Sequence, residues 1–351
     1  MSVERDDPAG GAPDGADALL RRAAKADARA ARRLVAAATE LATPDDARLD
    51  DELRAAIAAM LARLVEAIEA DLRHYAGRAA VLASSAAPSA DRLVRAGLFD
   101  DSALVAELVA RALGDLIAAR LPASPSDDAE RPSLLPRLAS APDRVVANAA
   151  NALMAAEARR RGPGPDTGRD DLAAELHHRL VWWVAAGLRP ERASAAVDAA
   201  LTDAARRVLA AHDEGARIEA AAQRLAAALD PAEDAIGAMI EEALADRRVA
   251  LAVALLAHGL AIEPALSREI LLDPDADRLL LALRALDVPH ETIAAIGLAL
   301  CEADRRRDPE VLVASLDAVM AMPVEIARDA VARLRLPADY RAALRALELA
   351  R

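Results

Sequence analysis

The sequence predicts an all-α protein, and composition, apolar spacing and helix-boundary signals each favour that fold class. Of its 351 residues, 54% are hydrophobic but only 1% are aromatic, so Ala, Leu, Val and Ile must form the core. Alanine and leucine are among the strongest helix formers, whereas the aromatic residues that favour strands are scarce. We therefore expect an N-terminal helical bundle followed by an array of antiparallel helix pairs.

The first part of the chain is expected to hold a disordered tail over 1–15 and a helical domain over 16–161. A first helix is predicted over 17–42, and a Thr-Pro-Asp-Asp stretch stops it. The clearest helix follows, because its apolar residues recur at steps of three or four and make one continuous stripe. The stripe consists of Leu49, Leu53, Ile57, Met60, Leu64, Ile68 and Leu72. Gly77 is expected to end this helix.

Three more helices are predicted before the middle of the chain, over 89–98, 102–121 and 142–161. Asp101 is a candidate N-cap for the second, because its carboxylate can accept hydrogen bonds from unpaired amide groups. Residues 122–136 contain several prolines and are interpreted as a loop, since proline disrupts a helix interior. The third helix ends in three arginines, whose charges oppose the negative end of the helix dipole.

Residues 162–169 are rich in Gly and Pro and are predicted to be a linker, because no regular element crosses such a stretch. The remainder, 170–351, is predicted to be a C-terminal domain of short successive helices. These helices are expected at about 170–188, 190–212, 215–229, 231–246, 248–260, 263–272, 275–286, 290–306, 309–321, 323–335 and 337–350.

Proline marks the start of several of these helices. Asp230, Asp273 and Asp308 each precede a proline, which combines an N-cap acceptor with a residue suited to the first helical position. Two successive helices make a unit of about 35 to 45 residues, the size of the repeats in HEAT and armadillo arrays. The sequence therefore predicts a HEAT-like, repeat-like arrangement, although internal sequence similarity is weak.

The helix expected over 170–188 carries a candidate partner surface. At 100° per residue, Trp183 shares a face with leucines and is expected in the core, whereas Trp182 points elsewhere. An exposed Trp flanked by Arg and His is typical of an interface hot spot. The candidate surface consists of Glu175, His178, Arg179, Trp182 and Arg189. The sequence leaves open that Trp182 is instead buried against a neighbouring helix.

Glu175 and His178 also have the Glu-x-x-His spacing of di-iron carboxylate bundles. That chemistry needs a second such pair and two further glutamates, and the sequence contains no second pair. We therefore expect no metal, no cofactor and no catalytic residue, and keep a metal-binding or enzymatic bundle using these two residues as an alternative.

Other catalytic signatures are missing from the sequence. No glycine-rich phosphate loop and no Gly-x-Ser-x-Gly elbow occurs. Cys301 is the single cysteine, and a lone half-buried thiol is usually inert. These features favour a protein that is not an enzyme, without excluding catalysis.

The charge pattern argues against a nucleic-acid partner. The formal net charge is -13, and most of the acidic excess follows residue 169, which should repel a phosphate backbone. Because Lys25 is the only lysine and arginine binds phosphate in a bidentate manner, arginine-mediated nucleic-acid binding stays a further alternative.

The sequence contains no recognisable export or membrane signal. Its first residues lack the apolar core of a signal peptide. The longest uncharged apolar run, Val249 to Ile262, is shorter than the roughly 20 residues of a membrane span and suits a buried core helix. We expect a cytoplasmic protein without a membrane span.

Three stretches carry a resemblance to a known family. They are 172–188, with its Glu175-Leu176-His177-His178-Arg179 segment, 270–286 with the following 296–300, and 93–101. These patterns resemble the bacterial domain of unknown function 2336 family over most of residues 45–350, except 122–136. The resemblance implies an all-helical, HEAT-like cytoplasmic protein, and brings no catalytic residue or substrate with it.

Successive helix pairs bury their apolar stripes against neighbours and leave an extended outer surface, which suits protein binding. The sequence therefore favours a protein-binding scaffold or regulatory adaptor. It does not identify the protein partner, and it leaves open a homo-oligomer.

Overall fold

The structure is a computed structural model that describes residues 48–77, 90–122, 133–161, 172–190 and 193–349. Within these ranges every regular element is a helix, which confirms the predicted all-α class. The chain divides into two units, 1–54 and 55–351, and the second unit contains the sites discussed below. The predicted tail and the helix over 17–42 lie outside the described residues.

The helices that precede the predicted linker agree with the sequence expectations, with two additions, a short α-helix and a 3₁₀ helix. Gly77 ends the first of them with a φ of 55° and donates a backbone hydrogen bond to the Arg73 carbonyl, a conformation that glycine adopts without strain. The elements are α2 (Asp51–Ala76), α4 (Ala90–Arg95), the 3₁₀ helix η2 (Leu98–Asp100), α5 (Ser102–Arg120), α6 (Leu134–Ala139) and α7 (Arg144–Arg161).

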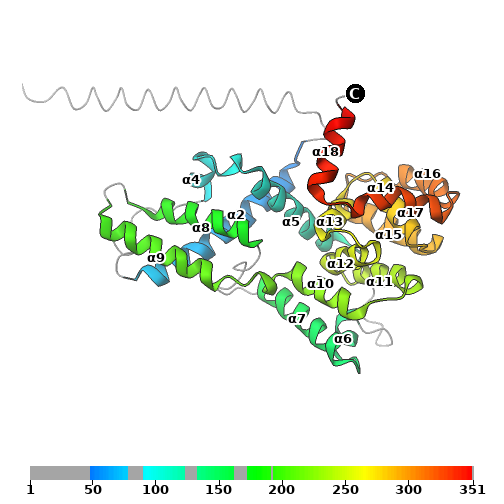
Figure 1. Ribbon diagram of the computed structural model, residues 1–351, viewed down its shortest axis with the longest axis horizontal. Coiled ribbons are helices and arrows are strands. Elements are labelled where there is room, and N and C mark those ends of the chain that lie inside the picture. Colours follow the sequence, from blue (N-terminus) through cyan, green and yellow to red (C-terminus); the bar gives the residue numbers. More distant parts are fainter. Residues whose placement is uncertain (1–47, 78–89, 123–132, 162–171, 191–192, 350–351) are drawn as a thin grey trace, which may run out of the picture. The chain divides into compact units, whose positions relative to one another are not determined.

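Eleven α-helices and two 3₁₀ helices follow among the described residues, close to the predicted positions (Figure 1). They are α8 (Ala174–Leu188), α9 (Ala195–Ala211), η3 (Glu214–Ala216), α10 (Ile218–Leu229), α11 (Glu233–Ala245), α12 (Val249–Leu260), α13 (Pro264–Leu272), α14 (Asp277–Ala285), α15 (His290–Ala303), α16 (Pro309–Met320), α17 (Val324–Ala332), η4 (Arg333–Arg335) and α18 (Ala338–Leu349).

Helix α6 corrects the interpretation of 122–136 as a loop. It begins at Leu134, and Pro136 lies in its first turn, where a missing amide hydrogen loses no intrahelical bond. The hydroxyl of Ser133 and the amide of Leu134 donate to Asp246 Oδ2, at 2.7 and 2.6 Å. A carboxylate more than a hundred residues away therefore caps this helix, so local sequence could not reveal it.

Two of the four predicted N-caps are found in the structure and two are not. Asp101 accepts from the amides of Ala103 and Leu104, and Asp308 accepts from the amide of Glu310, which confirms both caps. Asp230 and Asp273 instead lie at the C-terminal ends of α10 and α13. Their positions were predicted wrongly because an Asp-Pro pair also suits a turn between two helices.

Helix α12 is central to the core and confirms the prediction of a buried helix after Val249. Nine of its side chains are buried, and it contacts α5, α10, α11 and α13 (Figure 1). Taken singly, none of the helices among the described residues is long and apolar enough to cross a membrane.

Helices from both predicted domains share one hydrophobic core. Ile117 of α5 and Leu153 of α7 belong to the same buried cluster as residues of α10 to α17. Helix α7 packs on α10, and α5 contacts α12, α13 and α15. The linker over 162–169 lies outside the described residues, and the division into domains 16–161 and 170–351 stays a prediction about independent folding.

Two helical glycines give opposite expectations for an added methyl group. A Cβ at Gly237 of α11 would lie 2.6 Å from Cγ1 of Val288, whose branched side chain cannot turn away, whereas a Cβ at Gly114 of α5 would meet nothing within 4 Å. We expect Gly237→Ala to lower the free energy of unfolding by about 1–2 kcal/mol. Gly114→Ala should raise it by about 0.5–1 kcal/mol. Thermal and urea denaturation of both variants measure this, and equal signs would contradict the packing described.

Candidate functional site

The predicted partner surface on α8 is only partly assembled. The Trp182 indole N–H donates to Nε2 of His178 at 3.1 Å, and the Trp182 side chain is half-buried. Glu175 is exposed one turn earlier. Trp183 is also half-buried, so it lies at the margin of the core and not inside it as predicted. The structure therefore joins Trp182 to His178 without burying either completely.

The two arginines of that surface pair with carboxylates from other segments. Arg179 lies 2.7 Å from Oδ2 of Asp101, the residue that caps α5. Arg189 binds Asp198 in a bidentate manner, with distances of 2.6 and 3.2 Å. These guanidinium groups thus fasten α8 to α5 and α9, and a partner would meet them already paired.

No group of three or more His, Cys, Asp or Glu side chains suited to a metal ion occurs among the described residues. Burial raises the pKa of the Cys301 thiol, which keeps it protonated and unreactive at neutral pH. Among the described residues, the first of these observations gives no support to a metal site at Glu175 and His178.

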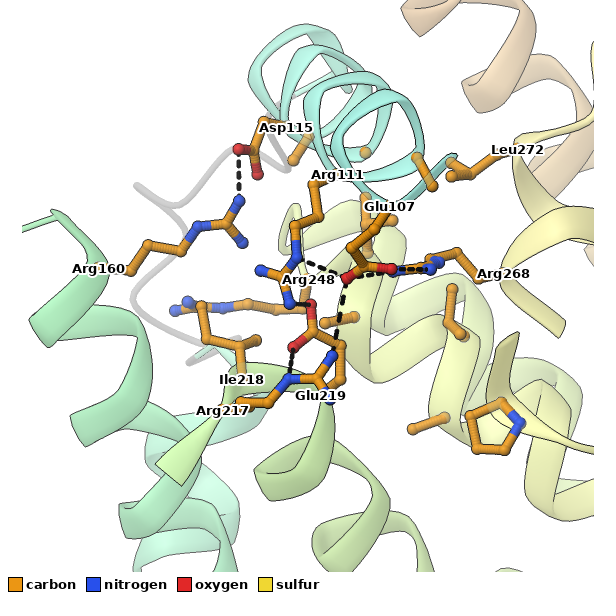
Figure 2. Close-up of a pocket in the computed structure, with 18 of the residues that line it drawn as sticks. Glu107, Arg111, Asp115, Arg160, Arg217, Ile218, Glu219, Arg248, Arg268 and Leu272 are labelled. Atoms are coloured by element: carbon orange, nitrogen blue, oxygen red, sulfur yellow. Dashed lines mark hydrogen bonds and ion pairs between the residues drawn. The ribbon is translucent and has the colours of Figure 1, made fainter. Parts of the chain in front are cut away.

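The described residues form a cavity of about 830 Å³. It lies among α2, α5, α7, α10, α12 and α13, and Figure 2 shows that charged side chains from several of these helices converge on it. Its volume falls in the range of small-molecule sites. No motif in the sequence marked these residues as one site.

Glu107 is the centre of the charged lining. Its carboxylate accepts from Nε of Arg111, one turn later on α5, at 2.7 Å. The same carboxylate receives both Nη groups of Arg268 from α13, at 2.5 and 3.3 Å. Such bidentate charge-assisted pairs are the strongest hydrogen bonds in proteins, so Glu107 ties α5 to α13 across 161 residues of sequence.

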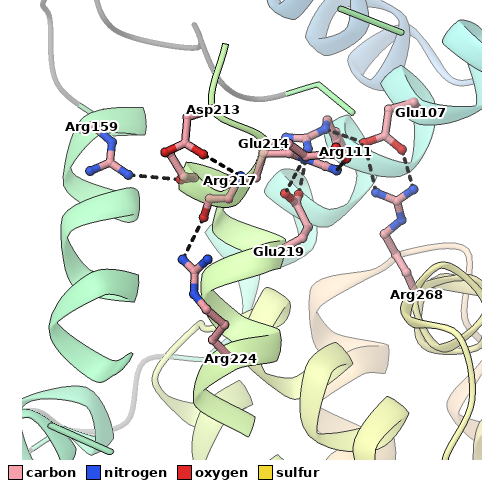
Figure 3. A network of polar contacts seen from close by, with 11 residues as sticks. Glu107, Arg111, Arg159, Asp213, Glu214, Arg217, Glu219, Arg224 and Arg268 are labelled. Atoms are coloured by element: carbon pink, nitrogen blue, oxygen red, sulfur yellow. Dashed lines mark hydrogen bonds and ion pairs between the residues drawn. The ribbon is translucent and has the colours of Figure 1, made fainter. Parts of the chain in front are cut away.

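A second carboxylate extends these contacts to α10. Glu219 lies 3.0 Å from Nη2 of Arg111 and 3.6 Å from Nε of Arg217, and Nη2 of Arg217 is 3.7 Å from Glu107 (Figure 3). We call Glu107, Arg111, Arg217, Glu219 and Arg268 the arginine–glutamate network. It connects three helices that come from distant parts of the sequence.

Electrostatics keep both network carboxylates ionised. Burial alone would raise the pKa of Glu107, but hydrogen bonds and charges from Arg268 and Arg111 outweigh it and lower that pKa to about 2. Burial opposes ionisation of Glu219 as well, and the charges of Arg111 and Arg217 again lower its pKa. The carboxylates and the guanidinium groups of the network compensate each other's charge, because a buried charge is tolerated only when it is paired.

The turn before α10 fixes the position of Arg217 in the network. Asp213 Oδ1 accepts from the amide of Gly215 at 2.9 Å, and Arg224 donates to the Gly215 carbonyl at 2.7 Å. Arg159, near the end of α7, donates to the Ala216 carbonyl at 3.0 Å (Figure 3). This arginine, predicted to oppose a helix dipole, thus holds the turn that carries Arg217.

The rest of the charged lining lies beside the network. Arg160 pairs with Asp115, and Arg248 pairs with Glu157. Arg247 donates to the Leu121 carbonyl at 2.9 Å. Burial lowers the pKa of the Arg248 guanidinium. These side chains give the cavity a cationic character.

The sequence does contain a signal for this site. On α5, Glu107 and Arg111 fall on the same face as Leu104 and Leu108, which are buried. Charged residues on an apolar stripe are rarely buried without partners. The pattern could therefore have marked α5 as a site of buried ion pairing, but not which distant arginines complete it.

A second feature absent from the sequence analysis is a pair of stacked histidines. The ring of His177, which is 3% exposed, stacks on His212 at the end of α9, with centroids 4.1 Å apart and planes 9° apart. Burial, reinforced by the charges of His212 and His178, lowers the pKa of His177 to about 4. The ring is therefore neutral in the folded protein at neutral pH.

No protein-family model, no curated protein and no solved structure matches this chain. The resemblance to the domain of unknown function 2336 family therefore stays a prediction.

We expect Glu107→Gln to lower the free energy of unfolding by roughly 3 kcal/mol, because it leaves Arg111 and Arg268 without their buried counter-charge. The matched control is Asp203→Asn, which removes a carboxylate from the exposed pair with Arg206 and should change stability by less than about 1 kcal/mol. Urea denaturation at pH 7 compares the two. Equal effects would mean that the network contributes no more than a surface pair.

His177 should make stability depend on pH. Its pKa is lower in the folded chain, about 4, than the ordinary value of 6.5. The unfolded chain therefore binds a proton between these values that the folded chain does not, and the free energy of unfolding should fall by roughly 3 kcal/mol as pH drops from 6.5 to 4. Denaturation at stepped pH measures this slope.

His177→Gln should remove that part of the pH dependence. His290→Gln, at the exposed start of α15, should retain it. Parallel stability curves for wild type and His177→Gln would rule out a buried neutral imidazole at this position.

Proposed function

We propose that this protein is a cytoplasmic helical adaptor whose C-terminal, HEAT-like helices bind a partner protein. The observation that carries the proposal is α18, an amphipathic helix whose apolar stripe is largely exposed in the described part of the chain. None of its described side chains is fully buried. Helices of this length are marginal in water unless their apolar face packs against something.

The stripe on α18 has the spacing of a binding helix. Tyr340, Leu344 and Leu347 are separated by four and three residues, so they share one face. Tyr340 is 55% and Leu347 is 65% exposed, while Leu344 is half-buried. The N-terminal turn of the helix is held by Arg341, which donates to the Leu334 carbonyl at 2.9 Å. A partner that covers this stripe would gain apolar burial on an anchored helix.

Exposed apolar side chains are also frequent on α15, α16 and α17, the helices that precede α18 in the sequence. Large hydrophobic residues with more than a third of their surface exposed include Leu298 of α15, Val311 and Val313 of α16, and Ile326 of α17. Scattered exposure of this kind is ordinary on any protein. Its recurrence on consecutive helices at one end of the sequence supports a binding role for that end.

The contacts between the C-terminal helices support the proposed HEAT-like arrangement. Helix α12 contacts α10, α11 and α13, and α14 contacts α16 and α17. Helix α15 departs from a simple array because it also contacts α5 and α11. We therefore propose a short array closed on one side by α5, with its later helices available to a partner.

The proposal is tested by placing a charge on the α18 stripe. In capture experiments from cells that make this protein, we expect the wild type to recover a defined partner and Leu347→Asp to lose at least about 90% of it, because the aspartate would have to be desolvated in the interface. Circular dichroism should show an unchanged helix content, since Leu347 is exposed.

Val145→Asp is the matched control, because Val145 is 66% exposed at the start of α7, away from α18 in sequence. It should recover the partner as the wild type does. Equal recovery by all three proteins contradicts a role for α18. A wild-type dimer that Leu347→Asp splits into monomers would assign the stripe to a second copy of this chain and overturn the adaptor proposal.

A further inference from the structure

The cavity lining carries a positive charge excess in a protein whose formal net charge is -13. Its arginines outnumber its carboxylates by seven to five. The arginines are Arg63, Arg111, Arg160, Arg217, Arg247, Arg248 and Arg268, and the carboxylates are Glu107, Asp115, Glu157, Glu214 and Glu219. A cationic concavity in an acidic protein is a local field that attracts anions.

The excess can be assigned to particular side chains. The arginine–glutamate network with Glu214, which pairs with Arg217 at 3.2 Å, balances three arginines against three carboxylates. Arg160 and Arg248 are matched by Asp115 and Glu157. Among the described residues, Arg63 and Arg247 have no carboxylate within ion-pair distance, and their two charges are the excess.

Arg248 adds a hydrogen-bond donor that is not used. Its Nε is buried and has no hydrogen-bond partner within the described part of the chain. A buried donor without a partner is unfavourable, and a ligand oxygen would relieve that penalty. Figure 2 shows Arg248 beside the network, among the side chains that surround the cavity.

One part of the lining is apolar. Ile218 of α10, Val249 and Val253 of α12 and Leu272 of α13 contribute to the same cavity. A site with convergent donors and an apolar wall suits an organic molecule that carries one anionic group. Inorganic anions would leave this wall unused.

We propose that the cavity binds a small organic phosphate monoester. A phosphate monoester carries a charge of about -1.5 to -2 at neutral pH, which matches the excess of Arg63 and Arg247. Two of its oxygens can accept the paired N–H groups of a guanidinium, and Arg248 offers the unused N–H. The organic part would lie against Ile218 and the α12 side chains.

The arginine–glutamate network prepares the site without being displaced. Arg111, Arg217 and Arg268 are held by Glu107 and Glu219 at fixed positions, so the cavity exists before a ligand arrives. Pre-ordered groups lose little freedom on binding, which favours affinity. The phosphate would pair with Arg247, Arg248 and Arg63 and leave the ion pairs of the arginine–glutamate network intact.

Calorimetric titration and thermal shift of the full-length protein test the proposal. The probes are adenosine 5′-monophosphate and glucose 6-phosphate, their uncharged parents adenosine and glucose, and inorganic sulfate at equal ionic strength. We expect at least one ester to bind with a Kd below about 1 mM and to raise the Tm by a few degrees at saturation. The parents and sulfate should bind at least about tenfold more weakly.

Arg63→Gln, Arg247→Gln and Arg248→Gln should each weaken binding of that ester about tenfold. Arg206→Gln is the control, because Arg206 is exposed, pairs with Asp203 and does not line the cavity, and it should stay within twofold of wild type. Arg63 is exposed, so its variant keeps the test valid even if loss of Arg248 impairs folding. Binding no stronger than that of sulfate for both esters, or equal weakening in Arg206→Gln, overturns the proposal.

Discussion

The buried carboxylate of Glu107 is the constraint on which the second unit depends. It lies on the apolar face of α5 and is ionised because Arg111 and Arg268 surround it. Ion pairs at the surface contribute little to stability, but a buried charge that loses its partner is strongly unfavourable. The network therefore holds α5 to α10 and α13 through buried charges that must stay paired.

The fold class was predictable because it depends on local chemistry. Helix-forming alanine and leucine, stripes such as that of α2, and proline or aspartate at helix starts act within a few residues, so the positions of α8 to α18 followed from them. Helix α6 was missed because its cap, Asp246, comes from the end of α11. The turns at Asp230 and Asp273 were misassigned because one dipeptide serves two turn geometries.

The candidate cavity was not predictable in the same way. Glu107 and Arg268 in its charged lining are 161 residues apart in sequence, and no motif of fixed spacing connects them. Glu107 and Arg111 on a buried stripe were the only local signal. The surface anticipated on α8 was correct in bringing Trp182 and His178 together, but Arg179 and Arg189 pair with carboxylates that are placed by tertiary packing.

The long connection between Glu107 and Arg268 also sets an order of events during synthesis. A ribosome adds about 5–20 residues per second, so α5 emerges on the order of ten seconds before the arginine that completes its ion pairs. Throughout that interval the newly made segment carries a charge on its apolar face, which discourages premature burial against wrong neighbours. Glu107 would then oppose non-native burial of α5 in the nascent chain and, in the folded protein, bind Arg268.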